Sequence, residues 1–458
     1  MKRVLTILCA LATFTAVAQR SGGIDAAMLE QIRSGYKGKA SDVAVKNALA
    51  STSISTLAVN GENLAMCDTH FKHQVKTKGI TDQKSSGRCW LFTGLNVLRA
   101  KMIAKHDLKG FEFSQNYLSF YDLLEKSNLF LQGIIDTREL PLDDRKVEWL
   151  LKSPIGDGGQ FTGVSNLITK YGAVPSSAMP ETYQSNNTRD MRMILSLKLR
   201  EYALKLREAR KGDIYLLKTA MLTNIYDILV KCLGVPPTEF VWTRYNSKGE
   251  RVSSKTYTPQ SFYAEFVGED LENNYVMLMN DPTREYGKVY EIDYDRHTYD
   301  GDNWLYINLP IERIKEVALA SIKDNTAMYF SCDVGKFFDR KRGVLDVTNL
   351  DYGSLFATDF PMNKKQRVST FASGSSHAMT LIAVDTDDNG KTTKWMVENS
   401  WGAKSGYQGN LIMTDQWFDE YMFRLVAERK YVPQEILKLL EQKPIMLPAW
   451  DPMFAPEE

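Results

Sequence analysis

The residues best suited to chemistry surround one cysteine, Cys89. Gly87 precedes it, Trp90 follows it, and apolar residues then recur at helical spacing, namely Leu91, Leu95, Leu98 and Met102. The pattern predicts a loop from residue 82 that becomes a helix at or next to Cys89. A helix N-terminus favours negative charge, and a thiol is an effective nucleophile only as a thiolate. The position therefore suits a nucleophile, although a buried helix cysteine beside a packing tryptophan has the same local sequence.

Gln83 lies six residues before Cys89. Its amide N–H₂ could point at the oxyanion that forms when a thiolate attacks a carbonyl, beside the backbone N–H of Cys89. Gly87 allows the tight approach of the backbone before the helix. The segment thus contains both a candidate nucleophile and a candidate oxyanion donor.

A histidine and an asparagine far downstream complete the candidate site. His377 stands at the entrance to a predicted strand, and Asn399 ends the next one, with Trp401 two residues later. Asp388-Asn389-Gly390 between the strands predicts a hairpin turn, which places both side chains at one sheet edge. An imidazole beside a thiol can form a thiolate–imidazolium pair, and an asparagine carbonyl can hold the other ring nitrogen. A strand-end histidine alone would indicate only packing, but three coincident signals favour catalysis.

The remaining pattern predicts an α+β protein with a helical N-terminal lobe and a strand-rich C-terminal lobe. Residues 189–210 predict a long helix with an apolar stripe. Buried strands are predicted at 327–332, 379–384 and 394–397, helical segments at 415–421 and 433–442, and a proline-rich, non-helical tail from 444. Residues 180–300 are charge-rich and aromatic, as in an insertion with helices of its own.

The first residues have the layout of a secretory signal. Lys2 and Arg3 precede an apolar, uncharged run, and Ala16-Val17-Ala18 is a small-x-small cleavage pattern. The prediction is removal of residues 1–18 and a secreted or periplasmic enzyme without stable membrane association. An uncleaved anchor is the alternative; lipidation of Cys9 is disfavoured because Leu8 stands where a small residue is required.

Composition excludes several classes of function. The 458 residues are 43% apolar and 25% charged, and loss of Lys2 and Arg3 would leave 55 basic against 56 acidic residues. Such a balance gives no long-range field for nucleic acid. The chain has five cysteines, and the four that would remain after removal of residues 1–18 predict at most one disulfide in so long a chain. Cys67, His70 and His73 offer only three metal ligands, so neither a metal nor another cofactor is expected.

The pattern of Gln83, Cys89-Trp90, His377 and Asn399-Ser400-Trp401-Gly402 resembles the papain-like cysteine peptidases. That family places its cysteine at the start of a helix in one lobe and its histidine and asparagine on the sheet lobe. Two features depart from ordinary papain. Ser86 replaces a disulfide cysteine, and His377 follows Cys89 by 288 residues, against roughly 130–150 in the papain pattern.

In both features the sequence resembles the bleomycin hydrolase and bacterial aminopeptidase C family. Further matching segments are Gln83 to Arg99, Asp157-Gly158-Gly159-Gln160, Lys170-Tyr171-Gly172, Asp333-Val334-Gly335-Lys336 and Thr393 through Met453. The resemblance implies a papain-like two-lobe fold with a large helical insertion and an extended C-terminal arm. The expected parts are a signal peptide (1–18), an N-terminal extension (19–75), a helical catalytic lobe (76–180), the insertion (181–300), the sheet lobe (301–443) and the arm (444–458).

The same resemblance implies a homohexamer and an aminopeptidase acting on peptides. The arm would fill the non-primed cleft, and its terminal carboxylate on Glu458 would meet the free α-amine of the substrate. Gly158 and Gly159 would pair their backbone with the substrate, or form a simple turn. Trp401 would cover the contact of His377 with Asn399, and Trp90 would support the nucleophile.

Two alternatives remain open at this stage. The arm ends in Phe454-Ala455-Pro456-Glu457-Glu458, unlike the small-residue ending typical of the family. An open cleft would give a papain-like endopeptidase. A catalytically idle peptide-binding or assembly protein is the alternative from another class; the presence of Gln83, Cys89, His377 and Asn399 argues against it.

Overall fold

The helix that begins at Cys89, α4 (Cys89–His106), runs through the middle of the structure. The structure is a computed structural model that describes residues 22–65, 68–451 and 453. Every residue of α4 from Cys89 to Ala100 is buried. A helix enclosed on all sides needs apolar or satisfied polar residues all round; Asn96, for example, donates to Thr81 Oγ1 at 3.0 Å. The predicted helix start at Cys89 is confirmed.

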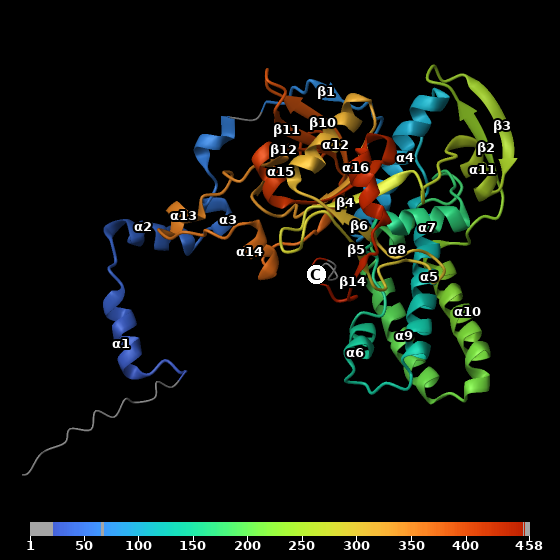
Figure 1. Cartoon of the computed structure of the whole chain (residues 1–458), viewed down its shortest axis with the longest axis horizontal. Helices are drawn as coiled ribbons and strands as arrows, with labels where there is room; N and C mark the ends of the chain where they lie inside the picture. Colours follow the sequence, from blue (N-terminus) through green and yellow to red (C-terminus); the bar gives the residue numbers. More distant parts are fainter. Residues whose placement is uncertain (1–21, 66–67, 452, 454–458) are drawn as a thin grey trace, which may run out of the picture.

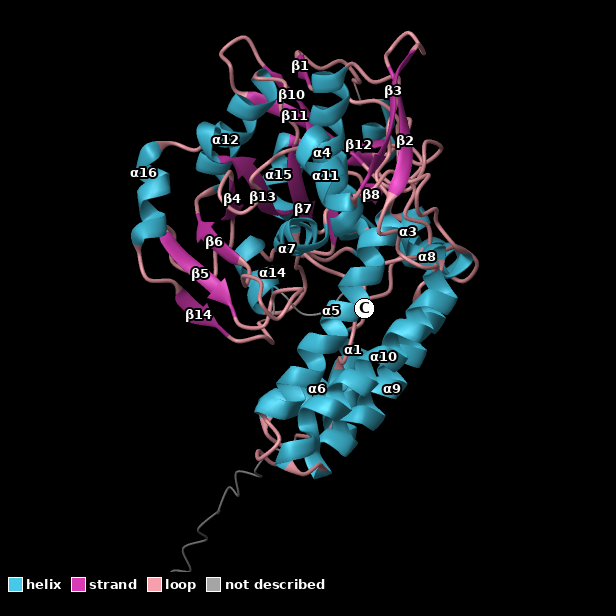
Figure 2. Ribbon diagram, turned by 90° about the vertical axis from the view of Figure 1, so that its right-hand side faces the viewer, coloured by secondary structure: helices cyan, strands magenta, loops and turns pink. Residues whose placement is uncertain are grey.

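A large mixed sheet forms the second lobe (Figures 1 and 2). Among the described residues its strand order is β14-β5-β6-β4-β13-β7-β10-β11-β12-β9-β8, with β1 paired to β10. Its central strands are β7 (Met328–Cys332), β10 (His377–Thr386), β11 (Thr392–Glu398) and β13 (Met422–Glu428). These pair antiparallel, and α4 packs against β7 and β10. The sheet thereby presents the start of β10 to the lobe that carries Cys89.

The outer strands complete the sheet, and most of its pairs are antiparallel. Parallel pairing occurs between β4 and β6, β5 and β14, and β9 and β12. The bounds are β1 (His73–Gln74), β4 (Tyr275–Met279), β5 (Lys288–Ile292), β6 (Leu305–Asn308), β8 (Phe338–Asp339), β9 (Val344–Leu345), β12 (Asn410–Thr414) and β14 (Ile445–Leu447). A separate hairpin joins β2 (Phe240–Tyr245) and β3 (Arg251–Tyr257).

Helices build the first lobe and a projecting bundle (Figure 2). Packed on α4 are α5 (Gln115–Asp136) and α7 (Phe161–Tyr171); the bundle adds α6 (Arg145–Lys152), α9 (Arg189–Glu208) and α10 (Ile214–Leu233) to α5. Shorter elements here are α8 (Tyr183–Asn186), α11 (Pro259–Phe266) and the 3₁₀ turn η2 (Lys211–Asp213). The apolar stripe predicted over 189–210 is buried on α9 at Leu195, Leu199, Tyr202 and Leu206. Burial of that stripe against α5 and α10 explains why this polar stretch is helical.

The sheet lobe carries its own helices on its outer side. They are α12 (Ile311–Lys323), α13 (Tyr352–Phe356), α14 (Lys364–Ser369), α15 (Asp415–Tyr421), η3 (Arg429–Tyr431), α16 (Gln434–Leu437) and η4 (Lys438–Glu441). The N-terminal segment contains α1 (Ala26–Gly35), α2 (Ala40–Leu49), α3 (Ile54–Leu57) and η1 (Gly61–Ala65). It extends away from the body, and α1 has no buried residue (Figure 1).

The α+β architecture with a helical lobe and a sheet lobe is as predicted. The expected strands correspond to β7, β10 and β11, and the turn between the last two has Gly390 at φ +80°. The stretch 181–300, expected to be a helical insertion, also contains strands. Its β4 and β5 belong to the large sheet, which ties this stretch to the lobe that carries His377.

Candidate active site

The loop before Cys89 is held by a buried carboxylate, Asp157. Its Oδ2 accepts hydrogen bonds from the backbone N–H of Gly87 at 2.7 Å and from Thr188 Oγ1 at 2.5 Å, and its Oδ1 pairs with Arg192. A Cβ on Gly87 would lie 2.5 Å from Oδ1, so the loop requires glycine here. Burial alone would raise the pKa of Asp157, but the hydrogen bonds from Thr188 and Gly87 and the Arg192 charge outweigh it and lower that pKa.

Arg88, the residue directly before Cys89, is anchored in the same way. It is 1% exposed and forms a bidentate pair with Glu181, at 3.1 and 2.7 Å. Its Nε also donates to Ser86 Oγ at 3.0 Å, and its guanidinium lies 5.2 Å from the ring centre of Phe92. A paired, bidentate arginine fixes direction as well as distance. The first residue of α4 is therefore presented by a rigid loop.

Gln83 spans the two lobes. Its Nε2 donates to the Ser86 carbonyl at 2.7 Å, and its Oε1 accepts from Ser400 Oγ at 2.6 Å. Its backbone N–H also donates to the Ser400 carbonyl at 2.8 Å. Because an amide nitrogen carries two hydrogens, one N–H of Gln83 remains after the bond to Ser86. The side chain is buried and fixed next to the segment that carries Asn399.

His377 and Asn399 are joined as the sequence predicts. His377 is the first residue of β10 and Asn399 directly follows β11, and the ring Nε2 lies 2.8 Å from Asn399 Oδ1. The same Oδ1 accepts the backbone N–H of Ser400 at 2.8 Å. A backbone N–H can only donate, so this atom is the amide oxygen and Nε2 must carry the hydrogen. The neutral ring therefore keeps its free lone pair on Nδ1.

The side chain of His377 is buried. The ring is stacked by Trp401, with centroids 4.7 Å apart and planes at 29°. Burial lowers the pKa of His377 to about 4, although the bond to Asn399 acts in the opposite direction. A charged ring at neutral pH thus needs an anion beside it.

A buried ion pair ties the two lobes behind these groups. Arg99 on α4 donates to Glu398 Oε1 at 2.7 Å, and both side chains are at most 5% exposed. Glu398 directly precedes Asn399, so the pair links the helix of Cys89 to the strand end of Asn399. Burial raises the pKa of Glu398, against the charge of Arg99.

The glycine pair after Asp157 has two different environments. A Cβ on Gly159 would lie 2.2 Å from the His297 ring and 2.8 Å from Trp90, whereas Gly158 has no atom within 4 Å of its ideal Cβ. Trp90 donates its Nε1–H to the Asp157 carbonyl at 2.7 Å. Gly159 is therefore required by packing, and Gly158 faces open space.

One cavity of about 480 Å³ brings these segments together. Gly87, two residues before Cys89, and Ser375, two residues before His377, both line it. Gly158 and Gly159 line it as well, as does Met453 at the end of the described arm. The segments leading to the candidate nucleophile and base thus border the same cavity.

The arm is fastened where it reaches this cavity. Arg424 on β13 donates through Nη2 to the Met453 carbonyl at 2.7 Å and through Nη1 to Gln160 Oε1 at 2.7 Å. Asp451 pairs with Arg284 and accepts the Met453 N–H at 3.1 Å. The arm therefore enters the cavity at a fixed place, while Glu458 lies outside the described residues.

Known proteins share this architecture. Residues 23–454 match the model of the Peptidase C1-like family. The chain belongs to the Peptidase C1-like family. It is 42% identical to bleomycin hydrolase of Homo sapiens over 402 residues, which cover 84% of this chain and 88% of that protein. Aminopeptidase C of Listeria monocytogenes is 40% identical over 387 residues, covering 84% and 87%.

A solved structure agrees with the fold. PepW from Lactobacillus rhamnosis HN001 superposes with a TM-score of 0.91 at 37% identity and covers 95% of this chain and 100% of that one. The papain-like fold and the resemblance to bleomycin hydrolases and aminopeptidases C are confirmed. This C1-like protein is a cysteine peptidase.

The predicted secreted or periplasmic location is wrong for this C1-like peptidase. Its relatives among the aminopeptidases C and G and PepW are typically intracellular enzymes. The short apolar run that suggested a signal peptide lies within residues 1–21, outside the described residues. Within the part that is described, no helix is both long and apolar enough to cross a bilayer.

The described cysteines of the C1-like peptidase lie on three elements: Cys89 on α4, Cys232 on α10 and Cys332 on β7. Cys232 is a free thiol, and burial raises its pKa. Cys67 lies outside the described residues. Among those residues that the structure describes, no group of three His, Cys, Asp or Glu side chains could hold a metal ion.

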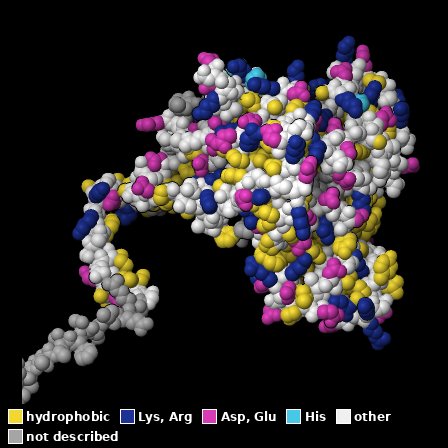
Figure 3. Space-filling model, in the orientation of Figure 1, with side chains coloured by type: hydrophobic (Ala, Val, Ile, Leu, Met, Phe, Trp, Pro, Cys, Tyr) yellow, Lys and Arg dark blue, Asp and Glu magenta, His cyan; other side chains and the backbone are white. Residues whose placement is uncertain are grey.

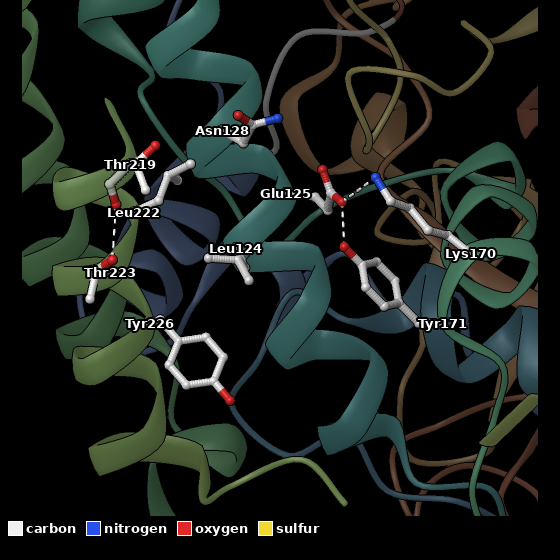
Figure 4. Close-up of a pocket in the computed structure, with 9 residues that line it drawn as sticks. All are labelled: Leu124, Glu125, Asn128, Lys170, Tyr171, Thr219, Leu222, Thr223 and Tyr226. Carbon is white, nitrogen blue, oxygen red and sulfur yellow. Dashed lines mark hydrogen bonds and ion pairs between the residues drawn. The ribbon is translucent and has the colours of Figure 1, made fainter. Parts of the chain in front are cut away.

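A second cavity of the C1-like peptidase, about 490 Å³, lies between α5, α7 and α10 (Figure 4). Its polar wall is an internal network in which Glu125 accepts from Tyr171 Oη and pairs with Lys170 at 2.7 Å. None of the predicted site residues lines it. Glu125, Lys170 and Tyr171 bind one another, and the cavity adds nothing to the candidate site.

Several positioning residues of the C1-like peptidase were missed by sequence reasoning. In the sequence, Asp157 stands out only as part of a family motif, and no pattern assigns a role to Glu181, Arg192 or Glu398. Asp157 and Glu398 could have been found because each directly precedes a predicted site residue: Asp157 precedes Gly158, and Glu398 precedes Asn399. Nothing local in the sequence identifies Glu181 or Arg192, since their partners are distant along the chain.

Proposed function

We propose that this C1-like peptidase is a cysteine aminopeptidase in which Cys89 is the nucleophile and His377 its base. Asn399 orients the base, and Gln83 stabilises the oxyanion. The observation that carries the proposal is the 2.8 Å contact of His377 Nε2 with Asn399 Oδ1, an oxygen fixed by Ser400. This contact leaves Nδ1 as the proton acceptor on a strand that packs against the helix of Cys89.

The first half of the reaction forms a thioester. Nδ1 of His377 takes the proton of Cys89, and the thiolate attacks the carbonyl carbon of the peptide bond. The oxyanion accepts hydrogen bonds from the backbone N–H of Cys89, at the start of α4, and from the remaining N–H of Gln83. The imidazolium then donates its proton to the departing amine, and the bond breaks.

The second half releases the acyl group. His377 removes a proton from water, the hydroxide adds to the thioester carbonyl, and the same donors stabilise the second oxyanion. Collapse expels the Cys89 thiolate and frees the carboxylic acid. Asn399 keeps the ring in one tautomer through both halves, and Trp401 excludes water from that contact.

Restriction to free N-termini is assigned to the C-terminal arm. The described arm reaches the cavity at Met453, beside the glycine pair that would align the substrate backbone. A segment that fills one end of a cleft excludes long substrates, and a carboxylate at its end rewards a charged α-amine. Glu458 would supply that carboxylate.

The test compares free and N-blocked aminoacyl coumarin amides on the purified protein. Free-amine substrates should be cleaved and blocked ones spared, and Cys89→Ala should abolish cleavage. Preferential cleavage of blocked peptides would instead favour the endopeptidase. No cleavage of either kind by a folded protein would favour the idle peptide-binding alternative.

Deletion of residues 454–458 tests the arm separately. The shortened chain retains the bond of Arg424 to the Met453 carbonyl, so the rest of the arm stays fastened. Activity should move from free N-termini towards internal bonds of a peptide of about ten residues, followed by mass spectrometry. An unchanged product pattern would remove the arm from the account.

A homohexamer belongs to the same proposal. The apolar side chains Met28, Leu29 and Ile32 of α1 are exposed on a helix that stands away from the body (Figure 3). Exposed apolar helix faces of this kind favour association with a further chain. Light scattering after size-exclusion chromatography should give six chains per particle, and a stable monomer would contradict the proposal.

A further inference from the structure

A carboxylate with no assigned role, Asp295, lines the cavity shared by the candidate site and the arm. It follows β5, and its backbone is fixed by hydrogen bonds from its N–H to the Ile292 carbonyl at 3.3 Å and from the Trp304 N–H to its carbonyl at 2.8 Å. The residue as a whole is partly exposed. The carboxylate is thus held in place on the wall next to the end of the described arm.

One oxygen of this carboxylate is unsatisfied. Oδ2 is buried and accepts no hydrogen bond. A buried unpaired carboxylate oxygen costs free energy that a bound cation can recover. Burial raises the pKa of Asp295 to about 6, against the charges of Arg424 and Lys126, so the group is mostly ionised at neutral pH.

The cations around Asp295 are committed to other partners. Lys126 donates to Asp122 Oδ2 at 2.8 Å and to the Gly158 carbonyl at 2.7 Å, and it also donates to the Gly156 carbonyl at 3.2 Å. All three of its hydrogens are therefore used. Arg424 donates to Gln160 and to Met453, as described above.

The other charged or titratable groups on the cavity wall are engaged as well. Arg192 pairs with Asp157, and Arg296 donates to Asn303 Oδ1 at 3.2 Å. His297 is bonded to Asp122 Oδ1 at 2.5 Å, and burial lowers its pKa, so that it does not provide a cation at neutral pH. Asp295 thus lines the cavity, and no protein cation is bonded to its buried Oδ2.

We propose that Asp295 is a specificity residue that binds the cationic group of the N-terminal residue of the substrate. The inference rests on the proposed function. The group bound is an ammonium or guanidinium ion, and its source is either the α-amine or a basic side chain. Met453 lines the same cavity, which places Asp295 on the side of the cleft that the arm closes, where an N-terminal residue would lie.

The test is the kinetics of Asp295→Asn on free-amine coumarin amides of arginine, lysine, leucine and alanine. If Asp295 binds the side chain, KM rises about tenfold to a hundredfold for arginine and lysine alone, with kcat nearly unchanged. If it binds the α-amine, KM rises similarly for all four. Unchanged KM values in a folded variant would overturn the proposal.

Two variants serve as controls. Asp293→Asn removes the charge two residues away, where the side chain pairs with Lys146 at 3.0 Å outside the cavity, and it should leave every KM unchanged. Asp295→Glu keeps the charge and should recover most of the lost affinity. An equal effect of Asp293→Asn, or no recovery with glutamate, would assign the change to folding and refute the specificity role.

The pH profile gives an independent readout. Protonation removes the charge of Asp295, so KM for the affected substrates should rise as pH falls through about 6 in the wild type and not in Asp295→Asn. If the wild type cleaves none of these amides, the proposed function has failed. In that case calorimetric binding of arginine amide to Cys89→Ala, with and without Asp295→Asn, tests the carboxylate by itself; equal affinities would overturn it.

Discussion

The two halves of the candidate site are held by different kinds of interaction. On the side of Cys89, the loop is fixed by charged side chains: Asp157 with Arg192, and Arg88 with Glu181. On the side of His377, the backbone is fixed by strand pairing, with β10 between β7 and β11. The His377 ring itself is oriented by its bond to the side chain of Asn399.

This difference shows what the helical insertion contributes. Arg192 lies on α9 and Thr188 is its N-cap residue, so two of the groups that bind Asp157 come from the bundle. The bundle therefore bears directly on the loop of the nucleophile. The sheet, in contrast, positions the base without help from the bundle. Substitutions in the two halves should therefore differ in their effects on kcat and on the unfolding free energy.

Substitution on the base side should affect catalysis most and stability least. Asn399→Ala frees the His377 ring to rotate, and we expect kcat to fall by about a hundredfold. The unfolding free energy should fall by about 1 kcal/mol, because the His377 Nε2–H and the Ser400 N–H lose their acceptor. The loss stays small because the substitution also removes a buried Nδ2 that has no hydrogen-bond partner. Asn389→Ala in the exposed hairpin turn is the control. An unaltered kcat for Asn399→Ala would refute the orienting role.

Substitution on the nucleophile side should instead combine both losses. Asp157→Ala releases Gly87 and leaves Arg192 without its partner, so we expect about 2 kcal/mol of destabilisation and a roughly tenfold lower kcat. The ion-pair contribution is moderated because Arg192 is 39% exposed. Urea unfolding and kinetics measure the two effects, with Asp190→Ala on the exposed side of α9 as control. A purely kinetic effect would mean that the bundle does not support this loop.

The smallest effect is expected for Glu181→Gln. Glutamine retains one acceptor for Arg88 but removes the charge, which we expect to cost about 1 kcal/mol of stability and less than about threefold in kcat. Denaturant midpoints of the variant and wild type measure it. A loss as large as that of Asp157→Ala would show that Arg88, not Gly87, is the main anchor of the loop.

Much of the half of the site that carries His377 could be predicted from sequence, because the patterns that indicate its strands and turn are local. The alternating strands around His377 and Asn399 and the glycine turn between them determine which residues meet at the sheet edge. The start of α4 was equally predictable from the apolar spacing after Cys89. These elements needed only periodicity and turn chemistry.

The rest depends on contacts between distant segments, which periodicity does not report. Asp157 lies 70 residues from Gly87, and Glu181 lies 93 residues from Arg88. The strands β4 and β5 lie in a charged stretch and could not be predicted from the local sequence, because their pairing partners, β13 and β14, lie far along the chain. Asp295 carries no local motif at all and becomes notable only through the cavity that it lines.

The central claim is that His377 activates Cys89 as a thiolate–imidazolium pair. Burial, only partly offset by the bond to Asn399, lowers the pKa of His377 to about 4, so the charged ring persists at neutral pH only if the thiolate stabilises it. In Cys89→Ala the ring should therefore stay neutral down to about pH 4, whereas in the wild type it should remain protonated well above that value. Nitrogen-15 NMR of the ring in both proteins measures the difference.

The most direct measurement is the rate of Cys89 alkylation by iodoacetamide against pH, with the site verified by peptide mass spectrometry. The account predicts a rate for the wild type that stays nearly constant from about pH 8 down to about pH 5. His377→Ala should lose about tenfold in rate per pH unit below a thiol pKa near 8.5, the value of an ordinary cysteine. A wild-type rate that follows the same ordinary thiol titration would contradict the account.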